Sequence, residues 1–191
     1  LCRMLAVATC SGTDQKLIMG KMPWDLQYPV LLGHESIGRV IKTGSRVRYL
    51  KEGDVVLRPT ALYPGQRLGQ YESMMGGFAE YGLVTDTRAL LEDEPGTDLG
   101  YAYYQLPVPA EADILPEDAL MLITLKETAG FLMNLRFSLN TPLVILGSAS
   151  VAQAMCFFAK LLGAVPLIVV GRRDEPLDEI RRFGADYTVN T

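Results

Sequence analysis

The sequence predicts an α/β protein whose first part is a β-rich barrel or sandwich and whose second part is a parallel sheet with helices. Two observations lead to this fold class. Up to about residue 84, short apolar runs alternate with turn residues, which is typical of a barrel or sandwich. After Asn140, continuous apolar runs alternate with helical segments, which is typical of strands buried on both faces of a parallel sheet.

The first part is expected to contain several short strands joined by polar or glycine-containing turns. The runs that we expect to form strands are residues 5–8, 37–41, 55–57 and 78–84, with a polar turn at 11–14. The segment 86–105 is acidic and contains a turn, and we interpret it as a surface excursion. A helix is expected to begin at Pro116, because proline is favoured in the first helical turn and two acids follow it.

The second part repeats one pattern, an apolar strand followed by a small-residue or polar loop and a helix. Strands are expected at residues 143–146, 167–170 and 186–190, and helices at 151–162 and 175–183. Gly163 and Gly184 follow these two helices and are typical helix-ending residues. This order predicts a right-handed βαβαβ arrangement with a parallel sheet.

Composition excludes several classes of protein. The net charge is −4 and the basic residues are scattered, which argues against nucleic-acid binding. No apolar run has the length of a membrane span, and no secretory signal peptide is recognisable. The three cysteines form neither a zinc ribbon nor a disulfide framework, so a reducing cytoplasm is the simplest location. The chain opens on Leu1 inside an expected strand, and we expect it to be part of a longer protein.

Several short motifs follow one another in the first part. They are Ser-Gly-Thr-Asp at 11–14, Leu-Gly-His-Glu at 32–35, Ile-Gly-Arg-Val at 37–40, Gly-Asp-Val-Val at 53–56 and Gly-Phe-Ala-Glu-Tyr at 77–81. In this order, and ahead of a βαβ unit, they resemble the medium-chain dehydrogenase/reductase family, in its zinc-type, alcohol dehydrogenase-like form. The resemblance implies a chaperonin-10-like, partly open β-barrel catalytic domain at residues 1–125. It also implies the truncated start of a Rossmann dinucleotide-binding domain, a doubly wound parallel sheet, at residues 126–191.

The same resemblance implies roles for individual residues of a catalytic zinc site. Thr13 matches a hydroxyl that relays the substrate proton, and Asp14 matches a carboxylate that orients the ligand histidine. His34 matches that ligand, Glu35 the acid beside it, and Glu127 a third ligand. Zinc held there would polarise the oxygen of an alcohol or carbonyl substrate.

One position departs from the family pattern. A zinc enzyme has cysteine three residues before the Asp, whereas this chain has Ser11 there and Cys10 one residue earlier. Successive side chains of a strand point to opposite faces, although a loop can redirect them. Other interpretations stay open: Cys10 as a small apolar residue, His34 as a hydrogen-bonded turn residue, and Glu127 as a solvated acid. No cysteine lies between residues 58 and 78, so a second zinc is not expected.

The loop after the first parallel strand is the expected phosphate-binding loop. Its residues are Gly147, Ser148, Ala149, Ser150 and Val151, which we expect to bind the cofactor. Alanine replaces the second glycine of the usual Gly-x-Gly-x-x-Gly pattern and adds a methyl group near the pyrophosphate. A parallel sheet that binds no nucleotide therefore stays a possible interpretation.

The end of the second parallel strand indicates which cofactor is used. An NAD site has Asp or Glu there, but this chain has Gly171, Arg172 and Arg173. Arginine binds phosphate with a fork of donors, so NADP is predicted. NAD remains an alternative through Asp174 or Glu175, and both arginines could be ordinary surface charges.

Together these features predict an oxidoreductase that transfers a hydride between NADP(H) and an alcohol, polyol or carbonyl substrate with the help of zinc. One alternative is a zinc-free quinone or enoyl-type reductase of the same superfamily, which Ser11 favours. Another is a non-catalytic binding module that retains the fold. The expected partners are a small-molecule substrate and, in the full-length protein, further copies of the same chain.

Overall fold

The computed structural model describes residues 1–23, 25–63, 65–73 and 75–191. These residues form two compact units, Leu1–Met121 and Leu122–Thr191, and each is described by itself. The sequence-based boundary between residues 125 and 126 lies within helix α4 (Met121–Leu135), at whose start the two units divide.

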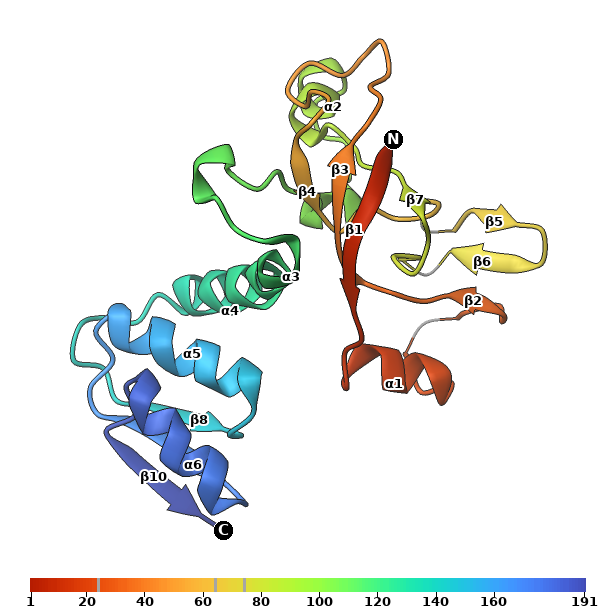
Figure 1. Cartoon of the computed structure of the whole chain (residues 1–191). Helices are drawn as coiled ribbons and strands as arrows, with labels where there is room; N and C mark the ends of the chain where they lie inside the picture. Colours follow the sequence, from red (N-terminus) through yellow and green to blue (C-terminus); the bar gives the residue numbers. More distant parts are fainter. Residues whose placement is uncertain (24, 64, 74) are drawn as a thin grey trace. The chain divides into compact units, whose positions relative to one another are not determined.

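The first unit is built around an antiparallel sheet. Strand β1 (Cys2–Ala8) pairs with β3 (Glu35–Val40) and β7 (Tyr81–Gly82), and β3 pairs with β4 (Val55–Leu57), which gives the order β4-β3-β1-β7 (Figure 1). A small second sheet consists of β2 (Val30–Leu31), β6 (Tyr71–Ser73) and β5 (Arg67–Leu68), in that order. Cys2, Val40 and Val56, which are buried and belong to β1, β3 and β4, pack together.

The first unit also contains short helical segments, one between β1 and β2 and the others after β7, and two of them correct the sequence-based expectation. They are α1 (Thr13–Ile18), α2 (Thr87–Asp93), η1 (Gly100–Tyr104), η2 (Ala110–Ala112) and α3 (Pro116–Ala119). Helix α1 starts inside the expected polar turn, and α2 lies in the segment interpreted as a surface excursion. The strand expected at 78–84 is reduced to β7, with one isolated bridge between Leu83 and Thr60.

The second unit is a parallel sheet with helices packed on one face. After α4 it contains β8 (Leu143–Leu146), α5 (Ser150–Leu161), β9 (Leu167–Gly171), α6 (Asp174–Ile180), η3 (Arg181–Phe183) and β10 (Tyr187–Asn190). The strand order is β10-β9-β8, as the βαβαβ pattern predicts. Cys156 is fully buried in this core, as expected, and burial raises the pKa of its thiol to about 11.

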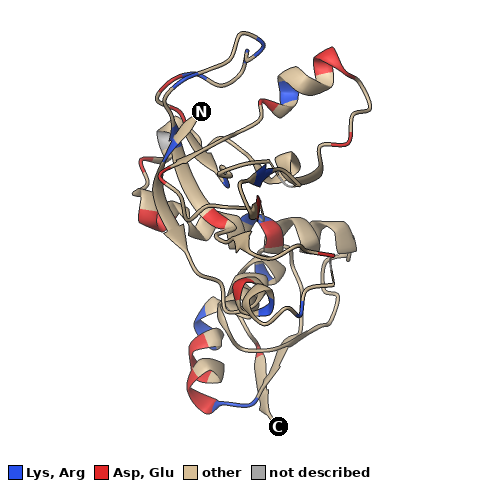
Figure 2. Cartoon of the chain, turned by 90° about the vertical axis from the view of Figure 1, so that its right-hand side faces the viewer, with Lys and Arg blue, Asp and Glu red and all other residues tan. Residues whose placement is uncertain are grey.

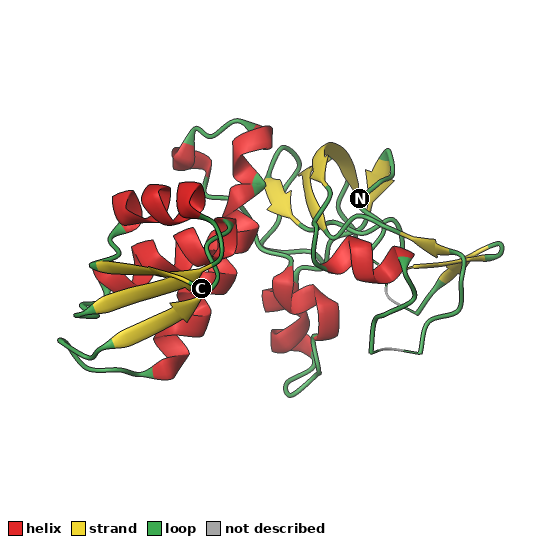
Figure 3. Cartoon of the chain, turned by 90° about the horizontal axis from the view of Figure 1, so that it is seen from below, coloured by secondary structure: helices red, strands yellow, loops and turns green. Residues whose placement is uncertain are grey.

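The two faces of this parallel sheet differ. Ile145 and Val169 point into the core beneath the helices, whereas Val144 and Leu146 are 53% and 81% exposed. Figure 3 shows the sheet from this bare side, with the yellow strands in front of the red helices. None of the helices in the described ranges has the length and apolar character of a membrane span.

Two glycines bring two backbone segments of the first unit into direct contact. Gly77 donates its N–H to the carbonyl of Gly33 at 2.6 Å, and Phe78 donates to Leu32 at 3.2 Å. A Cβ on Gly33 would lie 2.5 Å from the nitrogen of Phe78, and Gly33 has a φ of +100°. A Cβ on Gly77 would lie 2.8 Å from the Cβ of Ser36. Glycine is therefore required at both positions, and the chain entering β3 is held in place.

A buried carboxylate secures another loop of this unit. Asp86 is the N-cap of α2 and accepts from the backbone N–H groups of Ala89, Arg48 and Tyr49 at 3.0, 2.8 and 2.7 Å. Burial acts to raise the pKa of Asp86, but these hydrogen bonds outweigh it and the pKa lies below its usual value. The charged form of Asp86 therefore connects the segment around Arg48 to α2.

Substituting Gly77→Ala is expected to destabilise the first unit. The added methyl group would contact the Gly33 carbonyl and Ser36, so the two segments must separate, at a cost of about 1–3 kcal/mol. Gly44→Ala is the matched control, because nothing lies within 4 Å of a Cβ at that position. Urea unfolding followed by circular dichroism compares the two variants. Equal stability would show that the glycine contact is not a constraint.

Substituting Asp86→Asn is expected to cost about 1–3 kcal/mol at pH 7, because the charge-assisted hydrogen bonds are weakened. The folded-state pKa of Asp86 is lowered, so its stabilisation is present above the unfolded-state pKa and is lost as pH falls through the folded-state value. Urea unfolding from pH 7 to pH 2.5 should show the two proteins converging in stability. Glu52→Gln, at an exposed acid, should have no such effect. A pH-independent difference would contradict the role of the charge.

Candidate active site

Strand pairing in the first unit brings the ends of two motifs together. Ala8, the last residue of β1, pairs with Glu35, the first residue of β3. Cys10 follows β1 and His34 precedes β3, so both side chains lie at the same end of the strand pair. His34 also follows Gly33 directly, and its position therefore depends on the contact of Gly33 with Gly77.

One buried carboxylate binds both of these residues. Asp14, in the first turn of α1, places Oδ1 3.1 Å from His34 Nδ1, and its Oδ2 accepts the backbone N–H of Cys10 at 2.8 Å. Asp14 and His34 are 4% and 6% exposed, so solvent does not compete for these contacts. An ionised carboxylate can only accept, so His34 donates from Nδ1 and its Nε2 keeps a lone pair in the neutral ring.

Three potential metal ligands face one another beside this pair. The ligand atoms of Cys10, His34 and Glu35 all lie within 4.8 Å of one another. His34 Nε2, on the ring edge away from Asp14, is 3.8 Å from Glu35 Oε1. We call these three residues the ligand cluster. Nitrogen, oxygen and sulfur ligands of one tetrahedral zinc lie about 3.3–3.6 Å apart, so small side-chain shifts suffice for them to share an ion.

The expected metal-site residues are distributed as follows. Ser11 is exposed, and the thiol of the ligand cluster belongs to Cys10, which lies in the loop after β1. The alternation of side chains along a strand therefore does not apply to it. Thr13 is half-buried at the start of α1, next to Asp14. Glu127 lies on α4 in the second unit, and its role as a third ligand stays a prediction.

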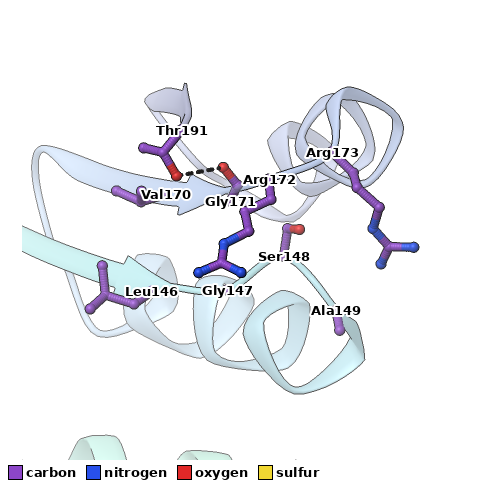
Figure 4. Close-up of a pocket in the computed structure, with 9 residues that line it drawn as sticks. All are labelled: Leu146, Gly147, Ser148, Ala149, Val170, Gly171, Arg172, Arg173 and Thr191. Atoms are coloured by element: carbon purple, nitrogen blue, oxygen red, sulfur yellow. Dashed lines mark hydrogen bonds between the residues drawn. The ribbon is translucent and has the colours of Figure 1, made fainter.

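The second unit contains a pocket of about 390 Å³ at the carboxyl ends of its strands (Figure 4). Its lining residues are Leu146, Gly147, Ser148, Ala149, Val170, Gly171, Arg172, Arg173 and Thr191. Gly147 has a φ of +121°, which favours glycine, whereas Ala149 has an ordinary extended backbone with φ −83° and ψ −177°. The loop therefore forms without a second glycine. Thr191, which sequence analysis did not single out, donates its backbone N–H to the carbonyl of Gly171 at 3.0 Å.

The first turn of α5 faces this loop without a capping side chain. Ala149 is its N-cap residue and makes no side-chain hydrogen bond, so the first backbone N–H groups of the helix keep their donor capacity. Ser150 and Val151, which were expected to bind the cofactor, are exposed in this first turn. Such a helix end attracts anions through its N–H groups and its dipole.

Two arginines give the pocket a positive charge. Arg172 and Arg173 are exposed, and among the described residues neither has an acidic partner within 4.0 Å. Figure 4 shows Arg172 reaching towards the loop at Gly147 and Arg173 pointing to the other side, and Figure 2 shows the pair as a blue stretch before the red first turn of α6. Asp174 accepts from Asn190 Nδ2 at 2.5 Å and does not line the pocket.

Comparison with known proteins agrees with this architecture. Residues 1–93 match the family described as "Alcohol dehydrogenase GroES-like domain". The chain is 28% identical to the NADP-dependent isopropanol dehydrogenase of Thermoanaerobacter brockii, with 98% of this chain and 53% of that protein aligned. It is 30% identical to the enzyme of the same name from Entamoeba histolytica, with 100% and 52% aligned.

Solved structures show the same fold at lower sequence identity. The crystal structure of benzyl alcohol dehydrogenase from Acinetobacter calcoaceticus matches with a TM-score of 0.75 at 18% identity, covering 99% of this chain and 55% of that one. The chain thus spans about half the length of the relatives that it matches. Its first domain belongs to the alcohol dehydrogenase GroES-like family, and the chain as a whole has the fold of the medium-chain dehydrogenases that it matches.

Proposed function

We propose that this chain supplies the metal-binding and nucleotide-binding parts of an oxidoreductase that transfers a hydride between NADP(H) and an alcohol, polyol or carbonyl substrate. The observation that carries the proposal is the ligand cluster supported by Asp14. Relatives named as NADP-dependent isopropanol dehydrogenases, and others named as D-xylulose reductase and sorbitol dehydrogenase, support this substrate class.

The chemistry of the ligand cluster fits zinc. Thiolate, imidazole and carboxylate are the ligands that zinc takes from proteins, and three protein ligands leave the fourth position open in a catalytic site. Cys10, His34 and Glu35 supply one of each kind. Zinc bound there would polarise the substrate oxygen and lower the pKa of an alcohol. That Glu127 supplies a third ligand, as the family resemblance implies, stays a prediction.

The residues around the ligand cluster have separate roles in this proposal. Asp14 holds the ring of His34 and the backbone of Cys10, so it orients two ligands without contacting the ion. Thr13 lies next to Asp14 at the start of α1, and its Oγ1 would accept the proton that the substrate hydroxyl releases while it passes its own proton to solvent. A hydroxyl suits this step because it can accept one proton and donate another.

The pocket of the second unit fits the nucleotide end of NADP. The uncapped first turn of α5 binds the pyrophosphate, and Arg172 and Arg173 bind the phosphate on the ribose 2′-oxygen. Because Asp174 is bonded to Asn190 and Glu175 does not line the pocket, no carboxylate among the lining residues is available for a 2′-hydroxyl. This charge distribution favours NADP over NAD.

Replacing Cys10 tests the metal site. Cys10→Ser should lower zinc affinity of the full-length protein by about 100-fold or more, because a hydroxyl is a much weaker ligand than a thiolate. Ser11→Ala, one residue later and exposed, should leave zinc affinity unchanged. Competition with a chelator, with metal content measured by mass spectrometry, compares the two variants. A loss with Ser11→Ala and none with Cys10→Ser would assign the ligand position to Ser11 and reject the ligand cluster.

Neutralising the two arginines tests the cofactor site. The double variant Arg172→Gln, Arg173→Gln should weaken NADPH binding about 10–100-fold, corresponding to lost charge-assisted hydrogen bonds, and leave NADH binding nearly unchanged. Arg182→Gln removes an exposed arginine that does not line the pocket and should change neither affinity. Nicotinamide fluorescence measures both. Equal losses for the two nucleotides would reject 2′-phosphate recognition, and no binding to the unaltered protein would favour the non-catalytic alternative.

A further inference from the structure

Ser148 and Gly171 are in close contact at the base of the nucleotide pocket. Gly171 is the last residue of β9 and is buried, and Ser148 is 8% exposed in the loop between β8 and α5. A Cβ on Gly171 would lie 2.9 Å from Ser148 Oγ and 3.1 Å from Ser148 Cβ. A methyl group of a third residue, Leu177, would lie close as well, with Cδ2 at 3.1 Å.

A side chain at position 171 would therefore require both Ser148 and Leu177 to move. Rotation about χ1 can move Ser148 Oγ away, but Ser148 Cβ is attached to the backbone and cannot follow it. Leu177 differs, because Cδ2 is the end of a flexible side chain and can move by a few tenths of an ångström. Ser148 is therefore the neighbour that most restricts a larger side chain at Gly171.

Position 171 matters because of where β9 ends. In dinucleotide-binding sheets, the acid that bonds the ribose 2′-hydroxyl stands at the end of the second strand, about 20 residues after the glycine-rich loop. Gly171 ends β9 and lines the pocket, and Arg172 and Arg173 follow it. A carboxylate at 171 would also lie next to Arg172 and would compete with a phosphate for it.

We propose that Ser148 is a specificity-determining residue for the nucleotide. By packing against Gly171, Ser148 excludes a ribose-binding carboxylate from the end of β9 and leaves the two arginines as the charged groups that line the pocket. Ser148 therefore acts on specificity through the residue that position 171 can carry, while the arginines supply the charge that prefers a 2′-phosphate. This inference rests on the proposed function, because it assigns Ser148 a role in the same nucleotide site.

A stability measurement on the full-length protein tests the steric part without any cofactor. Gly171→Ala should lower the melting temperature by several degrees, and the same change in a Ser148→Gly background should cost less than half as much. Gly130→Ala is the control, since nothing lies within 4 Å of a Cβ there, and its effect should be the same in both backgrounds. Equal costs of Gly171→Ala in the two backgrounds would overturn the proposal.

Nucleotide binding tests the specificity part. Gly171→Asp alone should gain little affinity for NADH, whereas Ser148→Gly with Gly171→Asp should bind NADH at least about tenfold more tightly than Gly171→Asp alone. Ser148→Gly alone should keep the preference for NADPH. Affinities are measured by nicotinamide fluorescence, and melting temperatures show that each variant is folded.

The outcomes separate this inference from the proposed function. If Gly171→Asp alone binds NADH as tightly as the double variant, Ser148 does not determine specificity, and the proposed function is unaffected. If the unaltered protein binds neither NADPH nor NADH, the proposed function fails and the inference fails with it. Tight NADPH binding by the unaltered protein, with NADH affinity gained only in the double variant, supports both.

Discussion

The contact between the backbone at Gly33 and the backbone at Gly77 is the constraint on which the ligand cluster depends. Two chain segments can approach to a 2.6 Å hydrogen bond there because neither position carries a side chain. The residue after Gly33 is His34, so the same contact that closes this part of the first unit also sets where the imidazole begins. A side chain at either glycine would displace the histidine together with the loop.

Asp14 is the second group that positions the ligand cluster. It is the buried carboxylate that joins α1 to His34, and its second oxygen holds the backbone of Cys10. A buried charge is costly unless hydrogen bonds compensate it, and here each carboxylate oxygen has a donor. The ligand cluster is therefore positioned by groups that are not ligands, which leaves the thiol, the Nε2 lone pair and the Glu35 carboxylate directed at one another.

Sequence patterns predicted the second unit better than the first, and the reason is physical. The strands β8 and β9 are short continuous apolar runs, and glycine ends the helical segments between them, so local composition is sufficient. Helices α1 and α2 were missed because their starts depend on distant partners. In the sequence Asp14 is typical of a turn, and its contact with His34 is seen only in the structure. Asp86 caps α2 and also accepts a hydrogen bond from the backbone of Arg48.

The residue types of the candidate site were predicted, but their geometry was not. Asp14, His34 and Glu35 come together as the motifs indicate, whereas the choice between Cys10 and Ser11 required the end of β1 and its register. That register changes by one residue at a bulge between Met4 and Ala6, for which the apolar pattern has no signal. Beyond Ala8 the alternation rule ends with the strand, so a cysteine one residue early can still reach the histidine.

The two sites share one feature. In each, a glycine without a side chain leaves space that allows a close contact by a neighbouring segment or side chain. At Gly33 the missing side chain lets the backbone of another segment approach, and His34 gains a buried position. Because Gly171 has no side chain, Ser148 packs directly against it, and the residues that line the pocket include two arginines and no carboxylate. Sequence motifs identify the residues that are charged or can bind metal. The structure adds that the glycines next to them allow the close contacts by which those residues are positioned.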